Sequence, residues 1–371
     1  MLTVVIAPDS FKGSASAAEM ARAIGDGWAS VRGEDRVVAA AMADGGEGTL
    51  DAFELAFPGA ERVPVAVQGP DNSEVLTSWL RLPASDGRPG GVGVVELAST
   101  SGITLIRELA PLDAHTLGFG QAIAAALDAG VSRLLLAIGG SSSTDGGVGA
   151  LAALGGRFTD AQDRPIRLGN RGLGTLARVD LSGLRAIPDG GAAILSDVTN
   201  PLLGPFGAAA VFGAQKGANE AQVVGMESGL VRLERLVRAE TRVRADAPGA
   251  GAAGGTGYGL LAWGAALAPG AAAVGDALGL PATIAGADLV VTGEGRFDAQ
   301  SAAGKVPSYV GELARIHGAR ALLVAGSIEA PVDSFADAVS LTHLAGSAEA
   351  AMADPLMWAR AAGARLASAI R

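Results

Sequence analysis

The sequence contains no cysteine, and it has only three lysines and three histidines among its 371 residues. The absence of cysteine excludes disulfide bonds, thiolate metal sites and a cysteine nucleophile. The three histidines, His115, His317 and His343, are too scattered along the chain to indicate a metal cage. The sequence therefore offers neither a thiol site nor a histidine metal centre.

Basic runs and targeting segments are missing as well. The net charge of −10 and the lack of any basic run argue against nucleic acid as a partner. The start of the chain has no basic region, and its apolar run is too short for a signal peptide. The uncharged segment 247–275 is rich in Ala and Gly and contains Pro269, whereas a membrane-spanning helix needs about 20 predominantly apolar residues. We expect a cytoplasmic protein without a membrane segment. A homodimer is compatible with the sequence.

The scarcity of lysine makes the three that are present informative. Lys12 and Lys216 each precede a glycine, and Lys305 follows one, whereas arginine supplies the remaining 25 basic residues. An ammonium group is a compact, strongly hydrated charge, unlike the planar guanidinium group. Glycine lets the backbone approach a ligand closely. This combination favours sites for phosphate or carboxylate groups.

The two ends of the chain alternate between strand and helix patterns. Ser16-Ala-Ala-Glu19 is a capping-box signal for a helix with Met20, Ile24 and Trp28 on one face. Strands that alternate with helices predict a parallel sheet covered on both faces. The strands are expected at 3–7, 37–41, 288–292, 320–325 and 338–341, with helices following 16 and 49, at 305–317 and before 370.

The middle of the chain begins with a different pattern. Val63, Val65 and Val67 alternate with polar or small residues, and this period of two is typical of antiparallel strands. We therefore predict a doubly wound, five-stranded parallel-sheet domain of flavodoxin-like type from residues 1–60 and 286–371. A larger mixed α/β domain, 61–285, is inserted into it. Further strands are expected at 75–82, 92–97, 133–138 and 192–196, with helices at 117–127 and 220–244.

Five glycine-containing loops follow predicted strands, and this position matters because ligands of open α/β sheets bind at the carboxyl ends of strands. Backbone N–H groups at such loops and at helix starts bind anions. Each loop alone is equally compatible with a structural turn. The loops span 7–13, 43–49, 139–147, 196–201 and 292–298.

The loop at 139–147 is the strongest candidate for phosphate binding, because four successive hydroxyl residues lie between two pairs of glycines. Standard nucleotide motifs do not fit the chain. Around Lys305 the P-loop pattern fails, since Ala299 occupies its first position and Val306 follows the lysine. The sequence from Gly257 to Ala262 matches the dinucleotide pattern only superficially, because it does not follow a strand. A dinucleotide enzyme is disfavoured.

Asp197 is the sharpest single candidate for catalysis. It ends a short apolar strand and precedes Thr199-Asn200-Pro201, so its side chain should lie at the carboxyl end of that strand. It is interpreted either as an Asx turn leading into the Asn-Pro step or as a carboxylate that accepts a hydroxyl proton during phosphoryl transfer.

Taken together, these loops resemble the bacterial glycerate kinase family, a two-domain family unrelated to P-loop kinases. The resemblance covers essentially the whole chain, with the motifs in the family's order. The tail that contains Lys305 departs slightly from the family pattern. The motifs are APDSFKGS at 7–14, ADGGEGT at 43–49, IGGSSSTDGG at 138–147, SDVTNPLLG at 196–204, FGAQKGA at 212–218, GAAGGTGYGL at 251–260 and TGEGRFD at 292–298.

The resemblance implies ATP-dependent phosphorylation of D-glycerate, with Mg²⁺ as cofactor and 2-phosphoglycerate as the favoured product, in a cleft between the two domains. Asp197 would be the general base, and Lys12 would act at the phosphates. Alternatives are a kinase for another small hydroxy-acid and a non-catalytic metabolite-binding relative. The expected phosphate or nucleotide ligands are Ser10, Gly139, Gly140, Ser141, Ser142, Ser143 and Thr144; the expected substrate ligands are Asp44, Glu47, Lys216 and Arg296; the metal candidates are Asp145 and Glu294.

Overall fold

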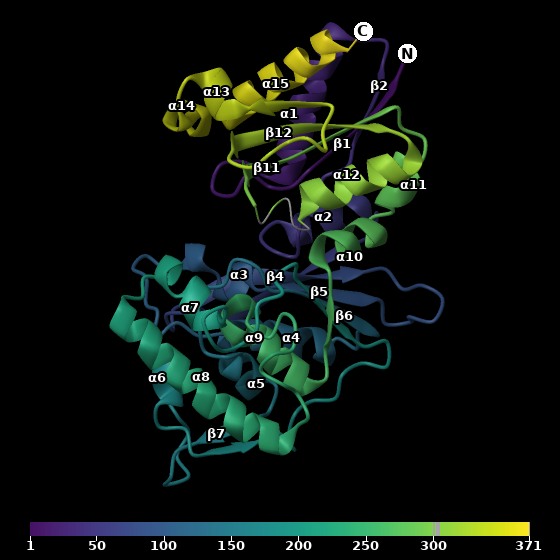
Figure 1. Cartoon of the computed structure of the whole chain (residues 1–371). Helices are drawn as coiled ribbons and strands as arrows, with labels where there is room; N and C mark the ends of the chain where they lie inside the picture. The colour runs from purple at the N-terminus through teal and green to yellow at the C-terminus, as the bar shows by residue number, and fades with distance from the viewer. Residues whose placement is uncertain (300, 302–304, 371) are drawn as a thin grey trace. The chain divides into compact units, whose positions relative to one another are not determined.

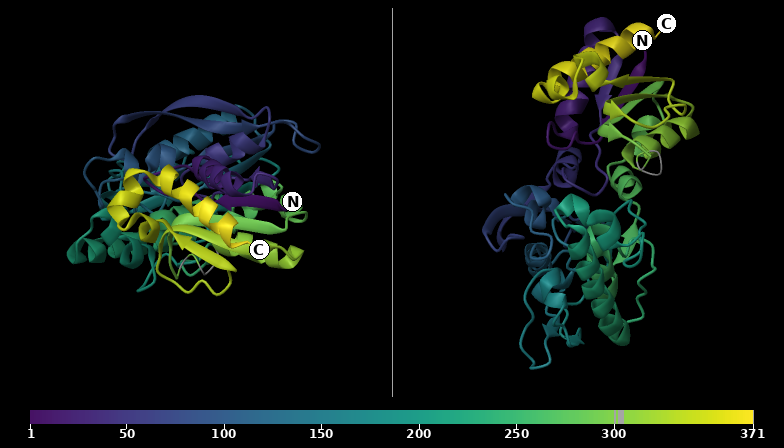
Figure 2. Two further views of the ribbon diagram at one scale, coloured as in Figure 1. Left: turned by 90° about the horizontal axis from the view of Figure 1, so that it is seen from above. Right: turned by 60° about the vertical axis from the view of Figure 1, so that its left-hand side comes forward.

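The computed structural model describes residues 1–299, 301 and 305–370. Part of the expected lysine-containing tail, 302–304, lies outside the described residues. The chain forms two compact units, shown in Figures 1 and 2. Unit 1 consists of Met1–Asp44, Asp51–Ala56 and Gly270–Arg371, and unit 2 of Gly45–Leu50 and Phe57–Pro269.

Unit 1 is built on a five-stranded parallel sheet to which both ends of the chain contribute. Its strand order is β13-β12-β11-β1-β2, and every neighbouring pair is parallel. Helices α1 and α15 pack together on one face, while α12 packs against β11 and β12 on the other (Figure 1). The strands are β1 (Thr3–Pro8), β2 (Arg36–Ala39), β11 (Leu289–Phe297), β12 (Arg320–Ile328) and β13 (Asp337–Ser340).

The helices of unit 1 follow from local sequence signals. Ser16 and Glu19 form the predicted capping box of α1, and Trp28 on the same helix is fully buried. Glycines let α1 and α15 approach closely, because a Cβ at Gly27 would meet the carbonyl oxygen of Arg360 at 1.9 Å. The helices are α1 (Ala17–Val31), α2 (Thr49–Ala56), α10 (Gly270–Ala277), α11 (Leu280–Ile284), α12 (Val306–His317), α13 (Leu341–Ala345), α14 (Ala348–Ala353) and α15 (Pro355–Ala369), of which α2 begins in unit 2.

Unit 2 contains a mixed six-stranded sheet of order β10-β9-β6-β5-β4-β3. The pairs β3–β4 and β4–β5 are antiparallel, whereas β5, β6, β9 and β10 run parallel to one another. The strands are β3 (Glu61–Gln68), β4 (Glu74–Leu82), β5 (Val92–Glu96), β6 (Arg133–Ala137), β9 (Ala192–Leu195) and β10 (Ala266–Ala268); β7 (Arg157–Thr159) and β8 (Arg178–Asp180) form a separate hairpin-like pair.

The helices of unit 2 pack around this sheet. Helix α4 lies against β3 and β5, and the long α8 contacts α6 and α7. Helix α9 contains a left-handed turn from Ala253 to Gly255, where the glycine-rich motif departs from helical geometry. The helical segments are α3 (Ala98–Ser101), η1 (Ile103–Leu105), α4 (Leu117–Asp128), α5 (Val148–Ala153), α6 (Asn170–Leu173), α7 (Ala208–Phe212), η2 (Ala214–Lys216), α8 (Glu220–Glu240) and α9 (Ala252–Trp263).

The predicted fold class is confirmed, including the five-stranded parallel sheet drawn from both chain ends and the mixed sheet between them. The units divide differently from the expected domains. Segment 270–285 belongs to unit 1, because α10 and α11 pack on α12 and Tyr309 donates a hydrogen bond to Asp276. Segment 45–50 belongs to unit 2, where Leu50 N–H donates to Glu96. Within the described residues, no helix combines the length and apolar character needed to cross a membrane.

The capping box of α1 gives a stability prediction. Replacing Ser16 with Ala removes the hydroxyl that accepts a hydrogen bond from Glu19 N–H at 3.3 Å, and we expect a loss of about 1 kcal/mol in the free energy of unfolding. Urea denaturation measures this loss. Ser30→Ala on the same helix is the control, because its exposed hydroxyl only donates to the Gly27 carbonyl. Equal effects of the two substitutions would contradict the capping role.

Candidate active site

Two buried carboxylates lie side by side at the carboxyl end of the unit 1 sheet. Strands β1 and β11 pair in register with Pro8 opposite Gly293, and the Asp9 N–H donates to the Gly293 carbonyl at 2.8 Å. Asp9 and Glu294 therefore occupy equivalent positions on neighbouring strands. Asp9 is 3% exposed and Glu294 6% exposed. Such burial of two like charges is costly without a compensating group.

The surroundings of these carboxylates are incompletely satisfied. The Ser10 N–H donates to Asp9 at 2.7 Å, but the buried Ser10 Oγ and Glu294 Oε1 have no hydrogen-bond partner among the described residues. Burial, and then the nearby Asp44, raises the pKa of Asp9 well above its usual range. Burial raises the pKa of Glu294 to about 7.

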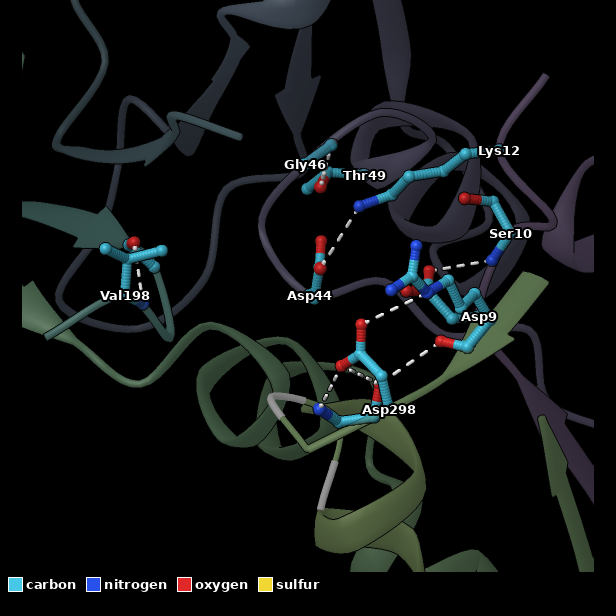
Figure 3. A network of polar contacts seen from close by, with 11 residues as sticks. Asp9, Ser10, Lys12, Asp44, Gly46, Thr49, Val198 and Asp298 are labelled. Atoms are coloured by element: carbon cyan, nitrogen blue, oxygen red, sulfur yellow. Dashed lines mark hydrogen bonds and ion pairs between the residues drawn. The ribbon is translucent and has the colours of Figure 1, made fainter. Parts of the chain in front are cut away.

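Lys12 is the cation closest in sequence to this cluster. Its ammonium lies 3.4 Å from the Asp44 carboxylate, and its side chain is 53% exposed (Figure 3). The Asp44 charge is the main reason that the pKa of Lys12 is raised. Lys12 thus remains protonated and able to contact an anion from the solvent side.

Asp9, Ser10, Lys12 and Glu294 line a pocket of about 370 Å³ that lies within unit 1. Exposed Arg296 at its rim forms ion pairs with Asp298 at 3.4 Å and with Glu329 at 3.0 Å. Lys305 also contributes to the rim. The lining also contains a group of apolar residues, Leu341, Ala348, Ala351, Met352 and Pro355.

The hydroxyl-rich loop lies in unit 2, directly after β6. Gly139 and Gly140 are accessible to solvent, whereas Ser142, Ser143 and Thr144 are almost fully buried. The loop is fastened to its neighbours: Ser142 Oγ donates to the Ser101 carbonyl at 2.8 Å. The solvent-accessible part of the loop is therefore its glycine end rather than its central hydroxyls.

Asp145 holds this loop together. Its carboxylate accepts hydrogen bonds from the N–H and hydroxyl of Thr116, at 2.9 and 2.8 Å, and from the N–H groups of Gly147 and Gly149, at 3.0 and 3.2 Å. It is fully buried. Because its oxygens are occupied by four donors, the geometry favours a structural function over metal binding.

Lys216 is buried beneath the same loop, with only 2% exposure. Its ammonium nitrogen donates to Ser141 Oγ at 2.9 Å and to the Ser143 carbonyl. Burial lowers its pKa to about 7, partly offset by Asp145. Gly254 is required nearby, because its φ is +66° and a Cβ there would lie 2.0 Å from the Ser143 carbonyl oxygen.

Asp197 follows β9, the strand next to β6. The register pairs Ala137 with Leu195, so the hydroxyl-rich loop and Asp197 begin at neighbouring strand ends. The glycines of the ADGGEGT motif belong to the same edge, since Gly139 N–H donates to the Gly45 carbonyl at 3.0 Å. Glu47 in that motif is exposed.

The sequence-predicted residues thus form two groups, one in each unit. Unit 1 brings together Ser10, Lys12, Asp44, Glu294 and Arg296, and unit 2 brings together the residues from Gly139 to Asp145, Lys216 and Asp197. Asp9 and Asp298 lie in the expected loops at 7–13 and 292–298 but are not among the expected ligands. An acidic residue directly after a predicted strand was a usable signal for Asp9. Among the described residues, no group of three or more His, Asp or Glu side chains is arranged as a metal cage.

An α/β fold of this kind defines a class of proteins that bind ligands at the carboxyl ends of their strands, the region where the glycine loops of this chain lie. Comparison with known proteins makes the class specific. The model of the glycerate kinase family matches residues 4–371. The chain therefore belongs to the glycerate kinase family.

Individual relatives agree with this membership. The chain is 40% identical over 332 residues to the glycerate 2-kinase of Escherichia coli K12, covering 88% of this chain and 86% of that one. It is also 40% identical to a glycerate kinase of Halalkalibacterium halodurans, with 88% and 86% coverage. A Salmonella typhimurium LT2 protein provisionally named glycerate kinase 2 has a crystal structure that aligns with a TM-score of 0.79 at 37% identity, covering 99% and 98% of the two chains.

The hydrogen bonds of Asp145 predict a large effect on stability. In Asp145→Ala, four buried donor interactions lose their acceptor, and we expect a loss of about 3–5 kcal/mol in the free energy of unfolding. Guanidinium denaturation monitored by circular dichroism measures it. Asp128→Ala serves as the control, because the exposed side chain of Asp128 forms a surface ion pair with Arg185. A loss below about 1 kcal/mol for Asp145→Ala would contradict the structural role.

The buried ammonium of Lys216 predicts a pH dependence. Its pKa is about 7 in the folded chain but about 10.4 when unfolded, so the unfolded chain binds more protons between these values. Its contribution therefore makes the free energy of unfolding rise with pH from about 7 to 10, by up to about 1.4 kcal/mol per unit.

Lys216→Met should remove this rise, as measured by urea denaturation across that pH range. Lys12→Met is a suitable control, because the folded pKa of Lys12 is raised rather than lowered. An unchanged pH slope in Lys216→Met, alongside an unchanged slope in the control, would refute the effect.

Proposed function

We propose that the protein is an ATP-dependent glycerate kinase that phosphorylates D-glycerate, with 2-phosphoglycerate as its product. Family membership supports the kinase reaction, and the E. coli relative named glycerate 2-kinase supports the 2-position. The observation that carries the proposal is the pairing of β6 with β9. It puts the accessible glycines of the phosphate-binding loop and Asp197 at neighbouring strand ends.

In this proposal the glycine end of the loop holds phosphate oxygens through backbone N–H groups. Gly139 and Gly140 are the main contacting residues, because they are accessible, and the buried Ser141 follows them directly. Ser142, Ser143 and Thr144 keep the loop in shape from their buried positions. Phosphoryl transfer requires positioning and charge stabilisation more than covalent chemistry, and a preorganised loop supplies both.

Asp197 is proposed as the general base. It would accept the proton of the attacking hydroxyl as the oxygen bonds to phosphorus and the bond to the leaving diphosphate breaks. General-base assistance contributes roughly 10²–10⁴-fold to a rate. Asn200 keeps the loop after Asp197 in place, since its side-chain N–H₂ donates to the Phe206 carbonyl at 2.9 Å.

The remaining charged residues are proposed to bind substrates. Lys12 is accessible and protonated, which suits contact with phosphate oxygens. Exposed Arg296 would pair with the carboxylate of glycerate, exchanging one of its present partners. Lys216 is buried, so we propose that it acts on substrate indirectly, by holding Ser141. Asp44 would orient Lys12, and exposed Glu47 would contact the hydroxyls of the acid.

Mg²⁺ is proposed as the cofactor, and the donors present fit it. Mg²⁺ prefers oxygen ligands and is usually bound by one or two carboxylates together with substrate phosphates. Glu294 has a buried carboxylate oxygen without a partner among the described residues, whereas the oxygens of Asp145 are occupied. When bound, Mg²⁺ would neutralise charge on the phosphates.

The direct test is an assay of the purified protein with Mg-ATP and D-glycerate. We expect ADP release that depends on glycerate, and a product that enolase consumes without added phosphoglycerate mutase. Product that enolase consumes only with the mutase would overturn the 2-position. Turnover with a different hydroxy-acid alone would overturn glycerate as the substrate. Binding of ligands without any turnover would favour the metabolite-binding alternative.

The proposed base predicts a kinetic signature. Asp197→Asn keeps the size of the side chain but removes the proton acceptor, so we expect kcat to fall about 10²–10⁴-fold with little change in KM for glycerate. Steady-state kinetics measure both constants. Asp189→Asn, an exposed residue before the same strand, is the matched control. Near-normal kcat in Asp197→Asn would rule the base assignment out.

A further inference from the structure

We propose that the pocket of unit 1 binds the nucleotide together with its divalent cation, which is held by Asp9 and Glu294. This inference rests on the proposed function and goes beyond it. It names the unit that receives the nucleotide and adds Asp9, a residue outside the initial candidates. Topology, donor chemistry and pocket composition support it separately.

The topology places the pocket where open sheets bind ligands. With the unit 1 strands ordered β2-β1-β11-β12-β13, the chain moves from β1 to one side and from β11 to the other. The switch point therefore lies between β1 and β11, and in such sheets ligands bind outside the carboxyl ends of the strands at this point. Asp9 directly follows β1, and Glu294 lies on β11 just past Gly293, the last residue of that strand that pairs with β1.

The side-chain oxygens of Asp9, Glu294 and Ser10 form part of the ligand shell of a cation. Asp9 and Glu294 are at least nine-tenths buried, and both line the pocket. Glu294 Oε1 and Ser10 Oγ lack hydrogen-bond partners among the described residues, although each lies where an unsatisfied oxygen is costly. Two carboxylates and a hydroxyl are hard oxygen ligands, which suit Mg²⁺ or Mn²⁺.

The small number of ligands points to a cation that arrives with phosphates. A structural metal cage would need more protein donors, and no group of three or more His, Asp or Glu is arranged as one within the described residues. Mg²⁺ commonly takes one or two carboxylates and completes its shell with substrate phosphates and water. A bare anion would instead face Asp9 and Glu294 directly and be repelled by them.

The walls of the pocket fit a nucleotide better than a three-carbon acid. The volume of about 370 Å³ falls in the range of pockets for ligands much larger than glycerate. Lys12 and Lys305 supply positive charge near the carboxylates. Leu341, Ala351 and Met352 from α13 and α14 also line the pocket and offer an apolar surface for a base.

The test is a titration of the full-length protein with Mn²⁺, followed by electron paramagnetic resonance, with and without ADP and in the absence of glycerate. We expect one Mn²⁺ site that ADP tightens. Asp9→Asn and Glu294→Gln should each weaken Mn²⁺ binding about tenfold or more, and Ser10→Ala should weaken it less. Glu312→Gln, an exposed acid of α12 paired with Arg315, is the control and should bind as the wild type does.

Thermal denaturation of the same variants in EDTA checks that they fold. Neutralising either buried carboxylate relieves repulsion, so both variants should melt at or above the wild-type temperature. In a second melt with Mg-ADP and without EDTA, we expect the wild type to be stabilised and the two variants not to be. Wild-type Mn²⁺ affinity in folded Asp9→Asn and Glu294→Gln would overturn the proposal. A parallel titration in which D-glycerate, but not ADP, tightens Mn²⁺ binding would also overturn the proposal. Because glycerate is absent from the main titration, failure to phosphorylate it would leave an ADP-tightened Mn²⁺ site as support for this inference.

Discussion

The parallel pairing of β1 with β11 is the contact on which unit 1 depends. It joins strands that are separated by most of the chain, with Val4 opposite Leu289 and Pro8 opposite Gly293. The cost of closing a loop rises only slowly with its length, so unit 2 can be inserted between these strands without preventing their pairing. The same pairing puts Asp9 beside Glu294. The pairing of β1 with β11 therefore both stabilises the sheet and sets the position of its buried carboxylates.

The buried lysine of unit 2 shows why lysine is retained where arginine would otherwise serve. Lys216 can lose its proton in a buried site and still donate to the Ser143 carbonyl and to Ser141 Oγ. A guanidinium group would keep its charge there at a large desolvation cost. Lys12 occupies the opposite environment, where Asp44 favours its charged form. The two lysines beside glycines thus serve different physical purposes.

Much of the fold could be predicted from the sequence, because strand and helix periodicities and the Ser16 capping box are local signals. The order of loops along the chain also located the glycine-rich edge of unit 2. Side-chain accessibility could not be predicted in this way. The hydroxyls from Ser142 to Thr144 are buried by Ser101 and by neighbouring segments that are distant in sequence. Likewise, the four donors to Asp145 come partly from Thr116, so its structural function was not visible in the GGSSSTDGG motif.

The position of Asp9 in unit 1 could not be predicted from local sequence either, because its neighbour Glu294 lies on β11, far along the chain.

The most direct test of the account is a crystal structure of the protein with Mg²⁺ and a non-hydrolysable ATP analogue. We expect metal density in contact with the carboxylates of Asp9 and Glu294, and the nucleotide base against Leu341 and Met352. A metal bound elsewhere, with both carboxylates without a ligand, would contradict the account of how this edge of the sheet is used.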